Sequence, residues 1–302
     1  MNIKKILVVI DPQGDNTHVI QRARLFSIRF NAKVELAVFD YRLSVVLGNF
    51  YSSDKLDQAK HEFLLQKLKP LGLLAEEMGI PQERITCHIE WAQPLYRAIL
   101  SRVEQINADL IIKQTHHHNV INRSIFTNTD WHLIRESSVP VLFVKAGEYD
   151  SAMKLGAAVD PIKESGEDGV CPLSHSILNL AHQLCTTLPA ELNVIHCYEV
   201  VPSGLILEMD DVMPAWDDVR QAVRHRHELS MKKLMSADLE ASAKVTFEEG
   251  DIREKLPRLV SELNLDLVVM GGVSRSALER MAVGSTAEFV LDRLASDVLV
   301  IK

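Results

Sequence analysis

The sequence has 302 residues, of which 47% are hydrophobic and 25% are charged, and its formal net charge is −8 at pH 7. This length suits two domains of about 150 residues, and the composition is globular, which excludes disordered and fibrous chains. The negative charge argues against nucleic acid as a partner, because Lys and Arg supply most of that affinity. No stretch approaches the roughly 20 apolar residues that cross a bilayer. The four cysteines show no C-x-x-C spacing, so we expect reduced thiols in a cytoplasmic protein without membrane contact.

The first half alternates apolar strands with helices. In chain order its predicted elements are a strand (6–10), a helix (17–30), a strand (33–41), two helices (53–77 and 95–106), a strand (110–113), a short amphipathic helix near Thr127 and a strand (140–145). The strands are continuous β-branched runs without polar alternation, which is typical of parallel strands covered on both faces. Helices between such strands predict right-handed β-α-β crossovers.

The second half shows the same alternation. Its predicted elements are a strand (155–159), a helix (174–188), a strand (191–200), two helices (214–237 and 253–263), a strand (267–270), a helix (286–294) and a strand (297–302). Residues 109–145 align with 266–302 without a gap, and the strand that ends in Asp11-Pro12 corresponds to the one that ends in Asp160-Pro161. The sequence therefore predicts an internal repeat with domains at 1–147 and 154–302. Each should be an α/β domain with a doubly wound, Rossmann-like parallel sheet that binds ligands at the carboxyl ends of its strands.

The second repeat carries a glycine-rich loop. Gly271-Gly272-Val273-Ser274 follows the strand that ends at Met270, and Gly284-Ser285-Thr286 opens the last helix. This order resembles the universal stress protein signature G-x-x-G-x9-G-S/T, and the resemblance covers both repeats. It implies two tandem domains of the adenine nucleotide α-hydrolase-like type and an ATP site in the second. That site would use Asp160, Met270, Gly271, Ser274, Gly284, Ser285 and Thr286, although Ser274 replaces the second glycine and would narrow the loop.

The first repeat lacks the glycines of the signature. Gln114, His117, Thr127 and Asn128 stand at the aligned positions, so we expect no ATP binding of the family kind there. A buried Lys113 takes the place of Met270 and needs a charged partner, for which Asp11 is the predicted residue.

Histidines gather around the same loop of the first repeat. His116 and His118 lie in it, and Asp130 and His132 lie in the helix that the resemblance places opposite. Imidazole and carboxylate groups are zinc ligands, so these four residues form a candidate Zn²⁺ set. The alternative is a solvated histidine tract without metal.

Two functions stay open. The resemblance implies a stress-response protein that senses adenine nucleotide; the alternative is a scaffold or carrier without nucleotide. Such a carrier would bind zinc or an apolar small molecule, the latter between the apolar connectors 43–54 and 202–218. The sequence contains no G-x-S-x-G, H-E-x-x-H or Walker A motif, so we do not expect an enzyme. Family members dimerise through the last strand, so the resemblance implies an intramolecular pseudo-dimer and allows a homodimer.

Overall fold

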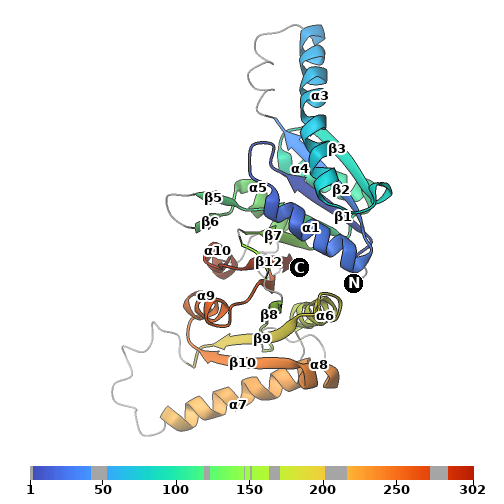
Figure 1. Ribbon diagram of the computed structural model, residues 1–302. Helices are drawn as coiled ribbons and strands as arrows, with labels where there is room; N and C mark the ends of the chain where they lie inside the picture. Colours follow the sequence, from blue (N-terminus) through green and yellow to red (C-terminus); the bar gives the residue numbers. More distant parts are fainter. Residues whose placement is uncertain are drawn as a thin grey trace. The chain divides into compact units, whose positions relative to one another are not determined.

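The structure of the chain, a computed structural model, describes residues 3–41, 53–118, 123–145, 147–149, 152–162, 171–200, 216–272 and 285–302. These residues form two compact units, which we call unit 1 (up to Glu148) and unit 2 (from Tyr149). In each unit helices pack on a parallel sheet (Figure 1). No helix in the described ranges is long and apolar enough to cross a membrane.

The sheet of unit 1 has the strand order β3-β2-β1-β4-β7, and all these strands are parallel. Its strands are β1 (Lys5–Ile10), β2 (Lys33–Asp40), β3 (Ile85–Trp91), β4 (Leu110–Gln114) and β7 (Val141–Val144). The helices are α1 (Thr17–Phe30), α3 (Ser53–Glu77), η1 (Gln82–Arg84), α4 (Leu95–Ile106) and α5 (Asn128–Glu136), and β5 (His116–His118) and β6 (Arg123–Ile125) form a separate hairpin. From β1 the successive strands β2 and β3 are added on one side of the sheet, and β4 and β7 lie on the other side of β1. The position between β1 and β4 is therefore the topological switch point, where parallel sheets of this kind bind ligands.

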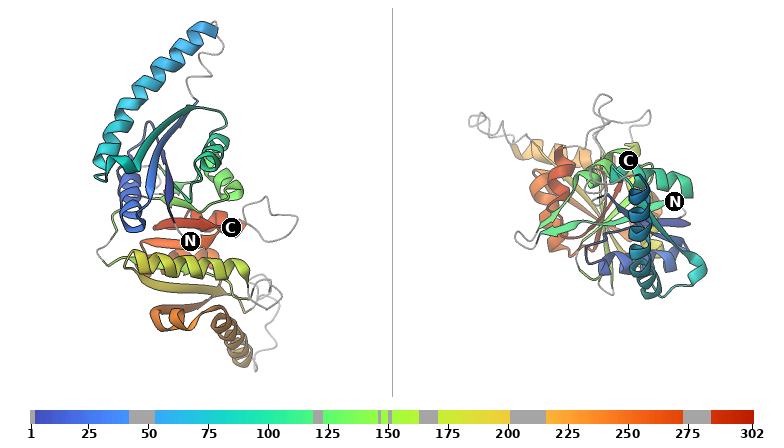
Figure 2. Two further views of the ribbon diagram at one scale, coloured as in Figure 1. Left: turned by 90° about the vertical axis from the view of Figure 1, so that its right-hand side faces the viewer. Right: turned by 90° about the horizontal axis from the view of Figure 1, so that it is seen from above.

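Unit 2 repeats this topology with the strand order β10-β9-β8-β11-β12. Its strands are β8 (Lys154–Ala158), β9 (Glu191–Tyr198), β10 (Ala243–Glu249), β11 (Leu267–Gly271) and β12 (Asp297–Ile301). Its helices are α6 (Pro172–Thr187), α7 (Trp216–Leu234), α8 (Ala237–Ser242), α9 (Ile252–Glu262) and α10 (Ser285–Leu291). Helix α6 packs on β8, β9 and β11, whereas α9 lies beside α10 (Figure 2).

Matched helix ends support the alignment of the repeats. Asn107 follows α4 and Asn264 follows α9, with φ angles of 50° and 51°. Both residues occupy the left-handed region that ends helices, which asparagine tolerates better than other non-glycine residues. Equivalent positions of the two units can therefore be compared residue by residue.

The predicted fold class is confirmed, because both units are parallel α/β sheets. Helices α1, α3 and α4 begin and end at the predicted residues. The edge strands β3 and β10 were not predicted, since many of their side chains are exposed or half-buried and the sequence shows no apolar run there. The predicted histidine loop is a strand in the structure, since His116–His118 forms β5 and pairs with β6.

Candidate functional site

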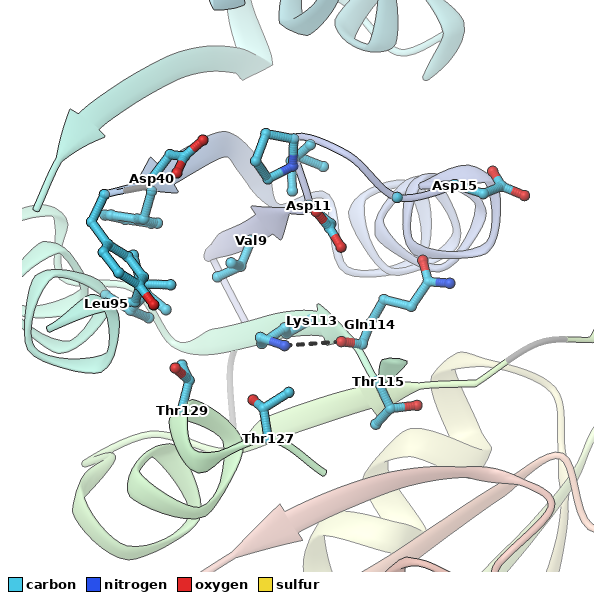
Figure 3. Close-up of a pocket in the computed structure, with 16 residues that line it drawn as sticks. Val9, Asp11, Asp15, Asp40, Leu95, Lys113, Gln114, Thr115, Thr127 and Thr129 are labelled. Carbon is cyan, nitrogen blue, oxygen red and sulfur yellow. Dashed lines mark hydrogen bonds between the residues drawn. The ribbon is translucent and has the colours of Figure 1, made fainter. Parts of the chain in front are cut away.

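A cleft of about 430 Å³ lies in unit 1 at the carboxyl ends of β1 and β4, at the switch point (Figure 3). Side chains of strands and of α4 form its apolar wall: Val9, Ile10, Phe39, Leu95 and Ile99. Polar groups complete the lining: Asp11, Asp15, Asp40, Tyr41, Lys113, Gln114, Thr115, Thr127 and Thr129. Asp40 was not predicted as a site residue, but it ends β2 just as Asp11 follows β1, and this shared place at a strand end is a usable signal.

Lys113 lies on β4 in this cleft, and its ion-pair partner is Asp130. The Nζ atom of Lys113 lies 2.8 Å from Asp130 Oδ1, and the two side chains are 11% and 0% exposed. Nζ also donates a hydrogen bond of 3.0 Å to the carbonyl oxygen of Gln114, which Figure 3 shows. The predicted partner, Asp11, was therefore wrong: its Oδ1 accepts from the backbone N–H of Gln13 at 2.9 Å, in the turn that follows β1.

Asp130 is held rigidly at the start of α5. Its Oδ2 accepts from the backbone N–H and the hydroxyl of Thr127 at 2.7 and 2.8 Å, and the Thr127 hydroxyl accepts in return from the N–H of Asp130. This capping box satisfies backbone donors that a helix start leaves unpaired. In unit 2 the aligned residues are the buried Met270 and Ala287, so both members of the ion pair are replaced by apolar residues.

The Asp-Pro turns at the ends of β1 and β8 have the same geometry. Asp160 Oδ1 accepts from the N–H of Ile162 at 3.2 Å, as Asp11 does from Gln13. The backbone of Asp160 is bonded to the Ser174 hydroxyl, whose oxygen lies 2.9 Å from its carbonyl. Each carboxylate is thus fixed at the carboxyl edge of its sheet.

The predicted nucleotide residues of unit 2 are described only in part. Met270 and Gly271 end β11 beside β8, the strand that precedes Asp160. A Cβ on Gly271 would lie 2.7 Å from Leu173 Cδ2 of α6, so a larger residue there would have to displace the end of that leucine side chain. Ser274 and Gly284 lie outside the described residues, as do the side chains of Ser285 and Thr286. Helix α10 begins at Ser285, one residue before the predicted start, and ends at Leu291 instead of Leu294.

Two of the four candidate zinc ligands, Asp130 and His132, have described side chains, and both are engaged by residues outside the set. Asp130 is engaged by Lys113 and Thr127, while His132 bonds Glu136 at 2.6 Å and stacks on Tyr96 with ring centroids 3.8 Å apart. The side chains of His116 and His118 lie outside the described part. In the residues that are described, no three His, Cys, Asp or Glu side chains form a group that could hold a metal ion.

Comparison with known proteins gives consistent matches. The model of the "Universal stress protein family" matches residues 2–145 and 171–302. Universal stress protein E of Salmonella typhi is 30% identical over 306 residues, which cover 99% of this chain and 94% of that protein. Universal stress protein E of Escherichia coli K12 is 29% identical over 305 residues, with the same coverage.

A solved structure is similar over nearly the whole chain. The crystal structure of a functionally unknown protein from Pseudomonas aeruginosa has a TM-score of 0.68 and 27% sequence identity, and the match covers 99% of this chain and 92% of that one. The two family matches fall on the two repeats, and each repeat has the same order of parallel strands. The chain therefore belongs to the universal stress protein family and contains two tandem domains of that family.

Proposed function

We propose that this protein is a stress-response sensor that binds ATP in unit 2 and not in unit 1. The observation that carries the proposal is the glycine and hydroxyl signature from Gly271 to Thr286, which begins at the switch point of the sheet. The fixed turn at Asp160 supports it, because it holds a carboxylate at the same edge. The unit boundary at residues 147–154 and the roles of Ser274 and Gly284 are part of this proposal.

The contrast between the units supports the choice of unit 2. In unit 1 Gln114 and Thr127 replace two signature glycines, and the ammonium of Lys113 lies at the floor of the cleft. An aromatic base placed on that floor would remove the remaining solvent from a charged group, which costs free energy. In unit 2 the aligned floor residues, Met270 and Ala287, carry no charge. We propose a binding and sensing role, not catalysis.

Native mass spectrometry with Mg-ATP tests this proposal, and the two units supply matched variants. Asp160→Asn and Asp11→Asn each keep the turn that follows the strand but remove one carboxylate. We expect one nucleotide per chain, bound at least tenfold more weakly by D160N, because a hydrogen bond to a charged group is worth about 1.5–3 kcal/mol. D11N should bind as the wild type does. Equal weakening by both variants, or no nucleotide adduct at all, would contradict ATP binding in unit 2.

The cleft of unit 1 favours a second candidate function, a carrier for an apolar small molecule. Its wall of Val9, Phe39, Leu95 and Ile99 is apolar, and its volume of about 430 Å³ suits a small ligand. Of the predicted connectors 43–54 and 202–218, only 53–54 and 216–218 are described, as the first residues of α3 and α7, so this candidate rests on the wall alone.

Mass spectrometry of the unliganded protein separates the two functions. A carrier should retain an apolar adduct, and Ile99→Glu, which places a carboxylate in the wall, should remove it. The same variant should leave Mg-ATP binding by unit 2 unchanged. Retention of the adduct by I99E would place the apolar molecule elsewhere.

A further inference from the structure

A pair of histidines, His196 buried and His227 half-buried, joins β9 to α7 in unit 2. His196 on β9 is 1% exposed, and its Nε2 lies 2.7 Å from Nδ1 of His227 on α7. The other ring nitrogen of His196, Nδ1, lies 3.0 Å from the carbonyl oxygen of Val159. Because a carbonyl oxygen can only accept, Nδ1 of His196 carries a hydrogen, and Nε2 of the neutral ring is then an acceptor. His227 therefore donates from Nδ1, and its own Nε2 carries no hydrogen while both rings are neutral.

The pair lies at the centre of the face by which α7 contacts the sheet. The buried and half-buried side chains of this face recur at helical spacing: Trp216, Val223, His227, Met231 and Leu234. Only Met231 and Leu234, both in the C-terminal part of α7, are fully buried. Tyr198 stacks on His227 with ring centroids 4.7 Å apart. His227 is thus the best anchored residue in the N-terminal two thirds of α7.

Among the residues that the structure describes around the pair, few charges could stabilise a proton on it. On α7, Arg224 bonds Glu228 and Arg220 bonds Glu249 of β10, each at 2.9 Å, so these carboxylates already have cations. Asp160 after β8 attracts a proton and Arg226 on α7 repels one. The neighbouring faces of β9 and β10 present Tyr198 and Phe247, which are neutral.

We infer that His196 and His227 form an acid-sensitive latch, which holds α7 on the sheet at neutral pH and releases it on acidification. A proton on His227 Nε2 would place a charge at the centre of an apolar contact face. A second proton would remove the acceptor on His196 and bring two cations within 2.7 Å of each other. Release exposes both rings to water, where each accepts a proton without this cost.

The direction of the pH dependence follows from the same groups. Burial, and then the neighbouring His196, lower the pKa of His227 to about 4, and burial also lowers the pKa of His196. The released state therefore binds more protons than the docked state between about pH 6.5 and 4. The contact of α7 with the sheet therefore has its full stability above about pH 6.5, and this stability falls as the pH decreases from 6.5 to about 4.

Hydrogen exchange of the full chain between pH 7.5 and 5.0 tests the latch. After correction for intrinsic exchange rates, we expect the opening of α7 to increase roughly 30-fold over this range, as for one group whose pKa moves from 6.5 to about 4. Protection of α3, the helix of unit 1 that lies between β2 and β3 as α7 lies between β9 and β10, should not change in the same way, because Val38 occupies the position of His196 there.

The variant that removes both titrating groups is H196V/H227L, which takes the valine from unit 1. In this variant α7 should stay protected from hydrogen exchange, and the protection should no longer depend on pH. An unchanged acid-induced opening in this variant, or flat protection of α7 in the wild type, would overturn the inference. If the variant does not fold, histidine proton resonances of the wild type decide, since the latch requires two rings that titrate well below pH 6.5.

Discussion

Replacing Lys113 by methionine, the residue that unit 2 carries at the aligned position, should destabilise unit 1 by about 3–5 kcal/mol. The substitution leaves Asp130, which is 0% exposed, as a buried carboxylate without its cation. Removing one partner of a buried ion pair lowers the free energy of unfolding by this amount, because the remaining charge cannot be solvated. Denaturant unfolding, with hydrogen exchange at β1 and β4 to locate the loss in unit 1, measures the change.

The double variant K113M/D130A is the matched control, because it installs the Met270 and Ala287 pair of unit 2. We expect it to recover most of the lost stability, with about 1 kcal/mol missing because the capping box of α5 also disappears. The two substitutions should therefore be strongly non-additive. If the double variant is as unstable as the sum of the single ones, Lys113 and Asp130 do not act as a pair.

The sequence predicted the need for this ion pair but not its partner. A lysine in a strand covered on both faces requires a counter-charge, and two carboxylates, Asp11 and Asp130, come to the same edge of the sheet. Which of them is within reach depends on side-chain directions. The capping box with Thr127 holds Asp130 toward β4, while the carboxylate of Asp11 is held in its own turn. No residue pattern contains that difference.

The strands and helices were predictable where burial is uniform. Strands such as β1 are covered on both faces, so every position from Ile6 to Ile10 is apolar and the run is visible in the sequence. The edge strand β3 contains exposed positions such as Cys87, so its pattern resembles a loop. The glycine signature was visible because it is local, whereas His196 and His227 lie on separate elements and meet only in the folded unit.

A second buried ion pair in unit 1 offers a comparable test. Arg102 of α4 holds Glu35 of β2 through two hydrogen bonds of 2.6 and 3.0 Å, and the side chain of Glu35 is 4% exposed. Replacing Arg102 by leucine, the aligned residue Leu259 of unit 2, should destabilise unit 1 by about 3 kcal/mol at neutral pH, since Glu35 loses its cation. Thermal or denaturant unfolding measures this change.

The pH dependence of R102L separates a lost charge partner from lost packing. Burial raises the pKa of Glu35, but the bonds and charge of Arg102 outweigh it, so the pKa in the folded wild type lies below the ordinary value of 4.5. The wild type therefore gains stability from Glu35 above about pH 4.5 and loses it as the pH falls through the lowered pKa. Without Arg102, burial dominates and the pKa of Glu35 in the folded state rises above 4.5. As the pH falls, the folded state then binds a proton at a higher pH than the unfolded state does. The stability deficit of R102L relative to the wild type should then be largest near pH 7 and shrink toward about pH 5.

The control variant is E35N/R102L, which carries the residues of unit 2 at both positions. Its stability deficit should be smaller and independent of pH. If the deficit of R102L itself stays constant with pH, only packing was lost.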